Sequence, residues 1–160
     1  MLPVKAGDQR LSDGARQKLE LFYRLFCEGE NRARYGLGHI VFACHASFPL
    51  LLSPELANLI WLNFGNYASR RGKAASGGGT AASDPGATPA QQKIDPVTVT
   101  DFLLSPLVRP VANRQYEIIP ELRSYFLYLL KDSRWFNLFG IQPFGEDRLN
   151  ELANFTLLYL

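Results

Sequence analysis

The chain has 160 residues, of which 47% are hydrophobic and 20% charged, and its formal net charge at pH 7 is +2. This size suits one domain with a core of its own, and the charge is too small to select a class of partner. No apolar run reaches the roughly 18–20 residues that a membrane span needs, and residues 1–10 lack the apolar segment of a secretion signal. We therefore expect a cytoplasmic protein without membrane contact.

Three helices are predicted in the first part of the chain. Ser12 is suited to cap the first of them, over residues 15–28. The second is a short, strongly apolar helix over residues 37–48. Ser53 and the proline that follows it form a helix start, which predicts a third helix over residues 54–64.

A segment of unusual composition follows. From Arg70 to Gln92 the residues are almost entirely Gly, Ala, Ser, Thr, Pro and Gln, and such a stretch buries too little apolar surface to offset the entropy of ordering it. We predict a long flexible linker or insertion over residues 70–93. It separates residues 1–69 from residues 94–160, and these two parts are expected to pack as one domain.

The remaining part of the chain is predicted to contain a β-hairpin between helices. A helix over residues 96–104 leads into the hairpin, whose arms are residues 107–111 and 115–119. The proline within the first arm indicates an edge strand. A helix over residues 120–131 follows, and a Trp- and Phe-rich connection leads from it to a last helix that begins near Glu146.

This last helix is apolar on nearly every side. Its apolar residues are Leu149, Leu152, Ala153, Phe155, Leu157, Leu158, Tyr159 and Leu160. A helix of this kind is either buried or open to a partner. Two interpretations follow: the natural polypeptide continues beyond Leu160, which we favour, or the helix docks on another chain.

The predicted order of elements is that of a winged-helix-like protein: a mainly α helical bundle with a two-stranded β-hairpin. Its second half is similar to the winged-helix portion found beside the nucleotide-binding modules of STAND-type signalling proteins. The residues that carry this resemblance are Leu103-Leu104, Leu107-Val108-Arg109, Tyr116-Glu117-Ile118 and Pro120-Glu121-Leu122-Arg123-Ser124-Tyr125.

A second resemblance covers residues 35–160 apart from the linker. Residues 39–64, 101–111 and 144–160 look like a helical segment of multidomain bacterial conflict and signalling proteins, where it accompanies caspase-like, TIR or formylglycine-generating-enzyme-like domains. The linker is longer than that segment leads us to expect. The resemblance implies a regulatory or adaptor module whose partner is another protein or a fused effector domain, and it brings no catalytic residues.

No set of residues converges on catalysis or metal binding. His39 and His45 are six positions apart and are placed on opposed faces of a helix, and zinc sites use paired ligands at closer spacings. Cys27 and Cys44 lie in apolar helical contexts and are expected to be buried thiols. We therefore predict no catalytic residue, no cofactor and no metal, and hence no enzyme.

DNA binding is the alternative that a winged helix invites. The helix before the hairpin enters the major groove in such proteins, and it brings basic or amide side chains to the bases. The helix over residues 96–104 carries Asp101 and no basic residue. Arg109 and Arg114 of the hairpin are the candidate phosphate contacts, so a protein partner is favoured over nucleic acid.

The sequence offers candidate contact residues for a protein partner. These are Trp61, Trp135, Phe136, Phe139, Leu157 and Leu158, with Tyr67 as a further aromatic candidate. Packing in the core is the alternative for the aromatic members of this set. We predict an adaptor or regulatory module of a bacterial signalling or defence system; the alternatives are a DNA-binding transcription regulator and an accessory subunit or inhibitor in a larger complex.

Overall fold

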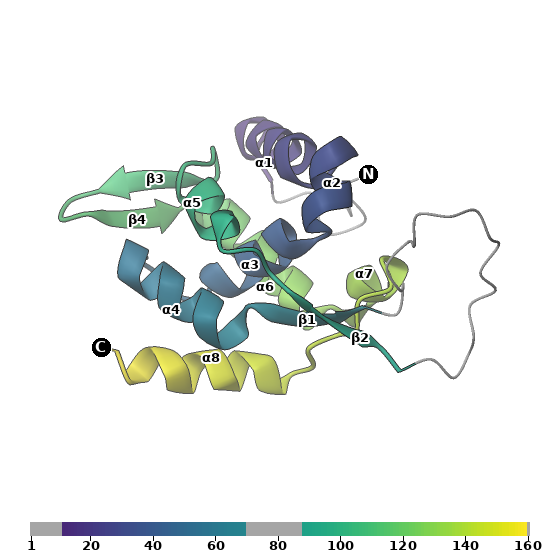
Figure 1. Ribbon diagram of the computed structural model, residues 1–160. Coiled ribbons are helices and arrows are strands. Elements are labelled where there is room, and N and C mark those ends of the chain that lie inside the picture. The colour runs from purple at the N-terminus through teal and green to yellow at the C-terminus, as the bar shows by residue number, and fades with distance from the viewer. Residues whose placement is uncertain (1–10, 70–87, 160) are drawn as a thin grey trace.

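The computed structural model describes residues 11–69 and 88–159 (Figure 1). Within them the chain is mainly helical, with two small antiparallel sheets, which confirms the predicted fold class. The helices are α1 (Asp13–Phe26), α2 (Gly29–Tyr35), α3 (Gly38–Ala46), α4 (Pro54–Phe64), α5 (Val97–Leu103), α6 (Pro120–Lys131), α7 (Ser133–Leu138) and α8 (Asp147–Leu157). The strands are β1 (Asn66–Ser69), β2 (Ala90–Lys93), β3 (Val108–Val111) and β4 (Gln115–Ile118).

Local capping signals place the helix starts. The hydroxyl of Ser12 accepts a hydrogen bond from the backbone N–H of Ala15 (3.3 Å), and that of Ser53 accepts one from Leu56 (3.1 Å). Each of these bonds satisfies a donor that has no partner within the first turn of its helix. The predicted bounds of α4 and α6, both of which begin at a proline, agree with the structure.

Two short helices and one small sheet differ from the prediction. Helix α2 is charged and buries none of its residues, so its sequence holds no apolar periodicity. Helix α7 forms within the expected Trp- and Phe-rich connection, where the carboxylate of Asp132 accepts from the N–H of Arg134 (3.0 Å). Strand β2 occupies the expected end of the linker, at Ala90–Lys93, and pairs with β1. The rest of the predicted linker, residues 70–87, lies outside the described residues.

Helix α3 is at the centre of the core, and all nine of its residues are buried. It packs against α4, α5 and α6. Four fully buried rings meet around it edge to face: Phe22 lies 6.5 Å from both Phe102 and Phe126, and Phe42 lies 5.5 Å from Phe102. These rings come from both sides of the linker, so residues 11–69 and 88–159 contribute to one core.

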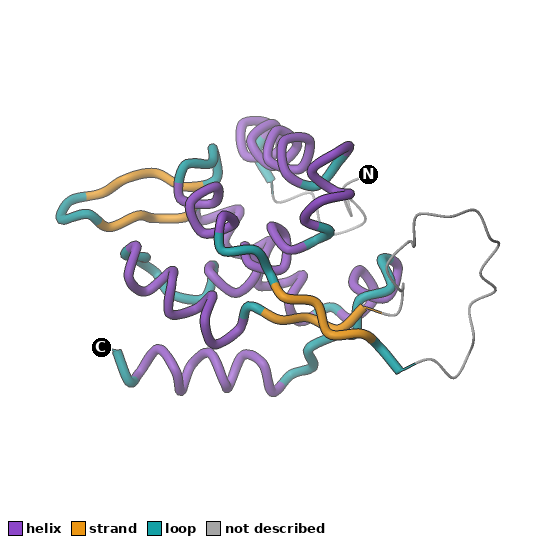
Figure 2. The backbone as a smooth tube through the Cα atoms, in the orientation of Figure 1, coloured by secondary structure: helices purple, strands orange, loops and turns teal. Residues whose placement is uncertain are grey.

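The hairpin belongs to a small sheet that a third segment extends. Leu52, in the loop before α4, exchanges two backbone hydrogen bonds of 2.8 Å with Tyr116 of β4. The expected order of helices, hairpin and further helix is present as α3, α4, α5, β3, β4 and α6; the bridge at Leu52 and the strands β1 and β2 between α4 and α5 were not expected. Figure 2 shows the hairpin projecting from the helices.

Proline protects the outer edge of this hairpin. Tyr116 directs its N–H and C=O toward Leu52, so it forms no hydrogen bonds with Pro110, the residue that faces it on β3. The nitrogen of Pro110 therefore faces the free edge of β3. A nitrogen without hydrogen cannot donate to an added strand. Asn113 and Arg114 form the turn with φ of 63° and 57°, a conformation that Asn tolerates better than Arg.

The core predicts a large difference between two positions of α6. Replacing the fully buried Phe126 by Ala is expected to lower the free energy of unfolding by about 3–5 kcal/mol, because it leaves a cavity among the rings. Tyr128→Ala, at a side chain that is 55% exposed, is the matched control, with an expected change within about 0.5 kcal/mol. Urea unfolding measures both, and equal losses would contradict this core.

Candidate functional site

Helix α5, which stands where a winged helix presents its recognition helix, exposes an uncharged strip. Thr98, Val99 and Phe102 face the core. The opposite side carries Val97 (38% exposed) and Thr100, and Leu104 (79% exposed), the C-cap residue directly after the helix, continues this side at positions i, i+3 and i+7. We call Val97, Thr100 and Leu104 the α5 face. It holds none of the Arg, Lys, Asn or Gln side chains that read base edges.

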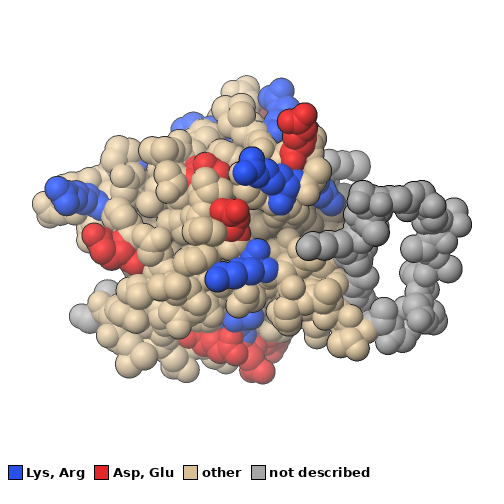
Figure 3. Space-filling view, viewed as in Figure 1, with Lys and Arg blue, Asp and Glu red and all other residues tan. Residues whose placement is uncertain are grey.

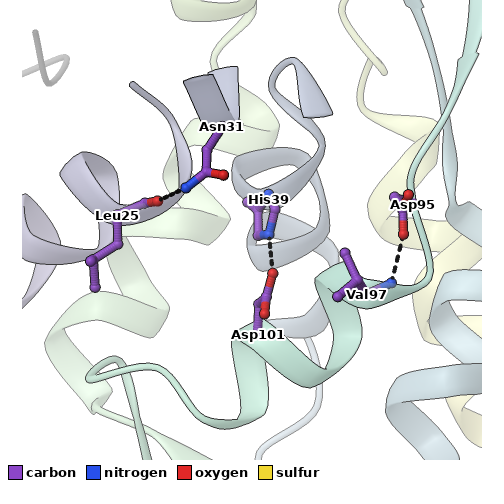
Figure 4. A network of polar contacts seen from close by, with 6 residues as sticks. All are labelled: Leu25, Asn31, His39, Asp95, Val97 and Asp101. Atoms are coloured by element: carbon purple, nitrogen blue, oxygen red, sulfur yellow. Dashed lines mark hydrogen bonds and ion pairs between the residues drawn. The ribbon is translucent and has the colours of Figure 1, made fainter. Parts of the chain in front are cut away.

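The acidic group of α5 is turned toward the core. Oδ2 of Asp101 lies 2.8 Å from Nε2 of His39 on α3 (Figure 4). The imidazole is buried and stacks on Phe26 at 4.8 Å between ring centroids, while the carboxylate side chain keeps 29% of its surface exposed. The pair joins α3 to α5. The sequence indicated Asp101 on this helix, but His39, 62 positions earlier, gave no local signal of the contact.

The two arginines of the hairpin differ in their surroundings. Arg109 donates to Oε2 of Glu117 from Nε (2.8 Å) and from the guanidinium NH2 (2.7 Å), across the register of β3 and β4. Arg114 is exposed in the turn. On the face shown in Figure 3, basic and acidic side chains are interspersed, without a continuous basic surface over the hairpin and α5. The predicted phosphate contacts are thus one arginine already paired and one arginine at a turn.

Most of the predicted aromatic contact residues lie in or against the core. Trp135 (3% exposed) and Phe136 (0%) are buried, and so is Tyr67 (6%), because the short helix α7 and strand β1 turn them inward. Core packing, the alternative given above, is therefore their role in this structure. Trp61 is half-buried and donates from Nε1 to the carbonyl of Ile94 (2.8 Å), and Phe139 is half-buried against the core.

The two predicted leucines of the last helix are exposed. Leu157 (70%) and Leu158 (83%) lie at the end of α8, where the ring of Tyr159 contacts that of Phe155 in a tilted arrangement, at 4.8 Å between centroids. The helix as a whole is amphipathic rather than apolar on all sides. Its polar side consists of exposed Asn150, Glu151 and Asn154, and Leu152 faces inward.

An aromatic cluster connects α3, α4 and the segment before α8. The ring of His45 stacks on Phe64 (5.8 Å) and meets the ring of Phe144 edge-on (4.9 Å). The guanidinium of Arg148 lies over Phe144 (4.7 Å) and Phe64 (5.3 Å). We call His45, Phe64, Phe144 and Arg148 the His45 cluster.

Burial determines the protonation of His45. Its Nδ1 lies 2.7 Å from the carbonyl oxygen of Val41, and since a carbonyl only accepts, Nδ1 carries the proton. Nε2 is buried without a hydrogen-bond partner among the described residues. Desolvation is the main reason that the pKa of His45 is lowered to about 4; the hydrogen bond to Val41 opposes this lowering, and the nearby charge of Arg148 contributes to it. His45 is therefore neutral at pH 7.

The cysteines have the surroundings of core residues. Cys27 and Cys44 are buried free thiols, and desolvation raises the pKa of Cys27 to about 12 and also raises the pKa of Cys44. Both are thus protonated at pH 7, which makes them poor nucleophiles and metal ligands. Within residues 11–69 and 88–159, no group of three or more His, Cys, Asp or Glu side chains is placed to hold a metal ion.

One small cleft lies beside β1 and β2. Its volume is about 200 Å³, and it is lined by Asn66, Gln91, Gln142, Phe144 and Arg148 among others. Sites for small molecules usually enclose about 300–1,000 Å³ and are mostly apolar. This cleft brings together no nucleophile and base.

Among the described helices, none is both long and apolar enough to cross a bilayer.

Comparison of the chain with protein-family models, with curated proteins and with solved structures gave no match.

The buried His45 predicts a loss of stability in mild acid. Its folded-state pKa of about 4 lies below the ordinary 6.5, so the unfolded chain binds the proton more readily. This contribution to stability is complete above pH 6.5 and declines as the pH falls from 6.5 to 4, by about 3 kcal/mol in total.

Urea unfolding between pH 7.5 and pH 4 (about one-unit steps) measures this decline. The variant His45→Phe keeps a ring in the cluster but has no group to titrate, so its stability is expected to depend less on pH over that interval. An equal dependence in both proteins would rule out His45 as the source.

Proposed function

We propose that this protein is a non-enzymatic interaction module that binds another protein through the α5 face. The observation that supports this best is the composition of that face. At the position where a DNA-binding winged helix presents base-reading side chains, the chain exposes Val97, Thr100 and Leu104. Such side chains gain free energy when a partner covers them, because apolar surface leaves water.

The surroundings of the α5 face favour a protein over nucleic acid. Asp101 places a carboxylate beside it, and its contact with the buried His39 leaves 29% of the carboxylate side chain exposed. Arg109 would have to leave Glu117 in order to contact a phosphate. Nucleic-acid affinity depends largely on such phosphate contacts, so Arg114 is the one hairpin arginine that is ready for them.

The biological setting comes from the resemblances in the sequence. The segments at residues 39–64, 101–111 and 144–160 suggest a regulatory or adaptor segment of a bacterial signalling or defence protein. In that setting the module works in the cytoplasm, and its partner is either a separate protein or an effector domain of the same polypeptide.

Affinity capture from the source cells with quantitative mass spectrometry tests the role of the α5 face. Leu104→Asp is expected to lose at least about tenfold in recovered partner, because it places a charge within an apolar interface. Leu62→Asp, at a side chain that is 64% exposed on α4, is the matched control and is expected to retain the partner. Equal recovery with both variants would contradict the proposal.

A DNA titration separates the alternative function. Fluorescence anisotropy measures the binding of labelled DNA duplexes at low salt. We expect no binding that is lost when Arg109→Glu and Arg114→Glu are made together. Salt-dependent binding that disappears in this double variant would instead identify a DNA-binding winged helix.

A further inference from the structure

Helix α8 covers an aromatic surface that belongs to other parts of the chain. In Figure 1 it lies alongside α4. Phe155 of α8 meets the ring of Phe64 at 5.3 Å, perpendicular to it, and Arg148 lies over the same ring. His45 packs against Phe64 from within the core. The surface under α8 is therefore formed by Phe64 and Phe144, with His45 packed behind them. Arg148 and Phe155 are residues of α8 that lie on it.

The attachment of α8 to this surface is shallow. Leu152 is the one residue of α8 that is buried, whereas α4 buries three residues and α6 buries four. Two buried nitrogens at the contact, Nε2 of His45 and Nε of Arg148, have no hydrogen-bond partner among the described residues. Unsatisfied buried polar groups weaken an interface. The apolar burial that holds α8 in place is therefore small, and the cost of leaving these nitrogens unpaired opposes it.

The segment before α8 is held independently of the helix. The N–H of Gln142 donates to the carbonyl of Ala68 (2.8 Å), and Ile141 forms a bridge with Ser69 of β1. Gly145 follows with a φ of 76°. Helix α8 can thus leave at Gly145 while Phe144 stays on the body of the protein, which would uncover the ring surface without unfolding the core.

The contact of α8 defines the occupant that fits this surface. Arg148, Leu152 and Phe155 lie at i, i+4 and i+7 on one helical face. A cation over two rings, a buried leucine and an edge-on aromatic ring form a pattern of anchors that another amphipathic helix can present. Leu157 at the end of α8, and Leu158 and Tyr159 in the turn after it, are exposed beyond the part that is anchored.

We propose that the surface under α8 is a second docking surface, which an amphipathic helix of a partner protein occupies by displacing α8. It is distinct from the α5 face, and its argument does not depend on that proposal. The partner helix carries an Arg or Lys, a Leu four positions later and an aromatic residue three positions after the Leu. In the free protein α8 takes this place and holds the surface closed.

A labelled peptide of residues 146–159 is the probe, added to the full chain and followed by fluorescence anisotropy. Since α8 competes with the peptide, weakening the hold of α8 should raise the apparent affinity by increasing the open fraction. Leu152→Ala in the chain is expected to tighten peptide binding at least about tenfold. Asn154→Ala, on the exposed side of the same helix, is the matched control and is expected to change nothing.

A peptide carrying Phe155→Asp tests the site of binding and is expected not to bind. If circular dichroism shows that Leu152→Ala unfolds the chain, Phe155→Ala in the chain replaces it, since that side chain is only half-buried. Peptide affinity that does not change in the weakened chain, or equal binding of the Phe155→Asp peptide, would overturn the proposal.

Discussion

The complete burial of α3 is the constraint on which the rest of the structure depends. A helix with every residue buried must be covered on all sides, and α4, α5 and α6 pack against it while Phe22 of α1 joins the same ring cluster. It also carries two histidines into the core. One ring nitrogen of each is paired: Nε2 of His39 with Asp101 of α5, and Nδ1 of His45 with the carbonyl of Val41 in its own helix. Because buried polar groups need partners, these contacts fix where α5 lies and which protonation state His45 has.

The position of α5 connects this core to the proposed function. Phe102 and the Asp101–His39 pair hold one side of the helix against α3, so Val97, Thr100 and Leu104 are directed outward beside the hairpin. The core therefore determines which side of the helix a partner meets. At the other end of the protein, α8 lacks such an anchor and depends on one buried leucine and on rings around Phe64, which is why we propose that a partner helix displaces it.

Local chemistry explains how much the sequence could predict. Ser53 and Pro120 mark helix starts that involve only neighbouring residues, so α4 and α6 were predicted closely, and the hairpin followed from its turn. Strand β2 depends on pairing with β1 across a long separation, and its residues Ala90–Lys93 show no apolar alternation, so it was missed. The lack of basic residues in α5 is visible in the sequence, but the side of the helix that is exposed, the His39–Asp101 pair and the burial of Trp135 arise from tertiary contacts that composition does not reveal.

Native-state hydrogen exchange, measured residue by residue, tests the central role of α3 most directly. If α3 is the element around which the others pack, its backbone amides should exchange only through global unfolding, with a free energy of opening equal to the free energy of unfolding from urea. Amides of the outer helices α2 and α8 should open at lower cost, since they bury none and one of their residues. Exchange of the α3 amides at a lower free energy than those of α1 and α6 would contradict the account.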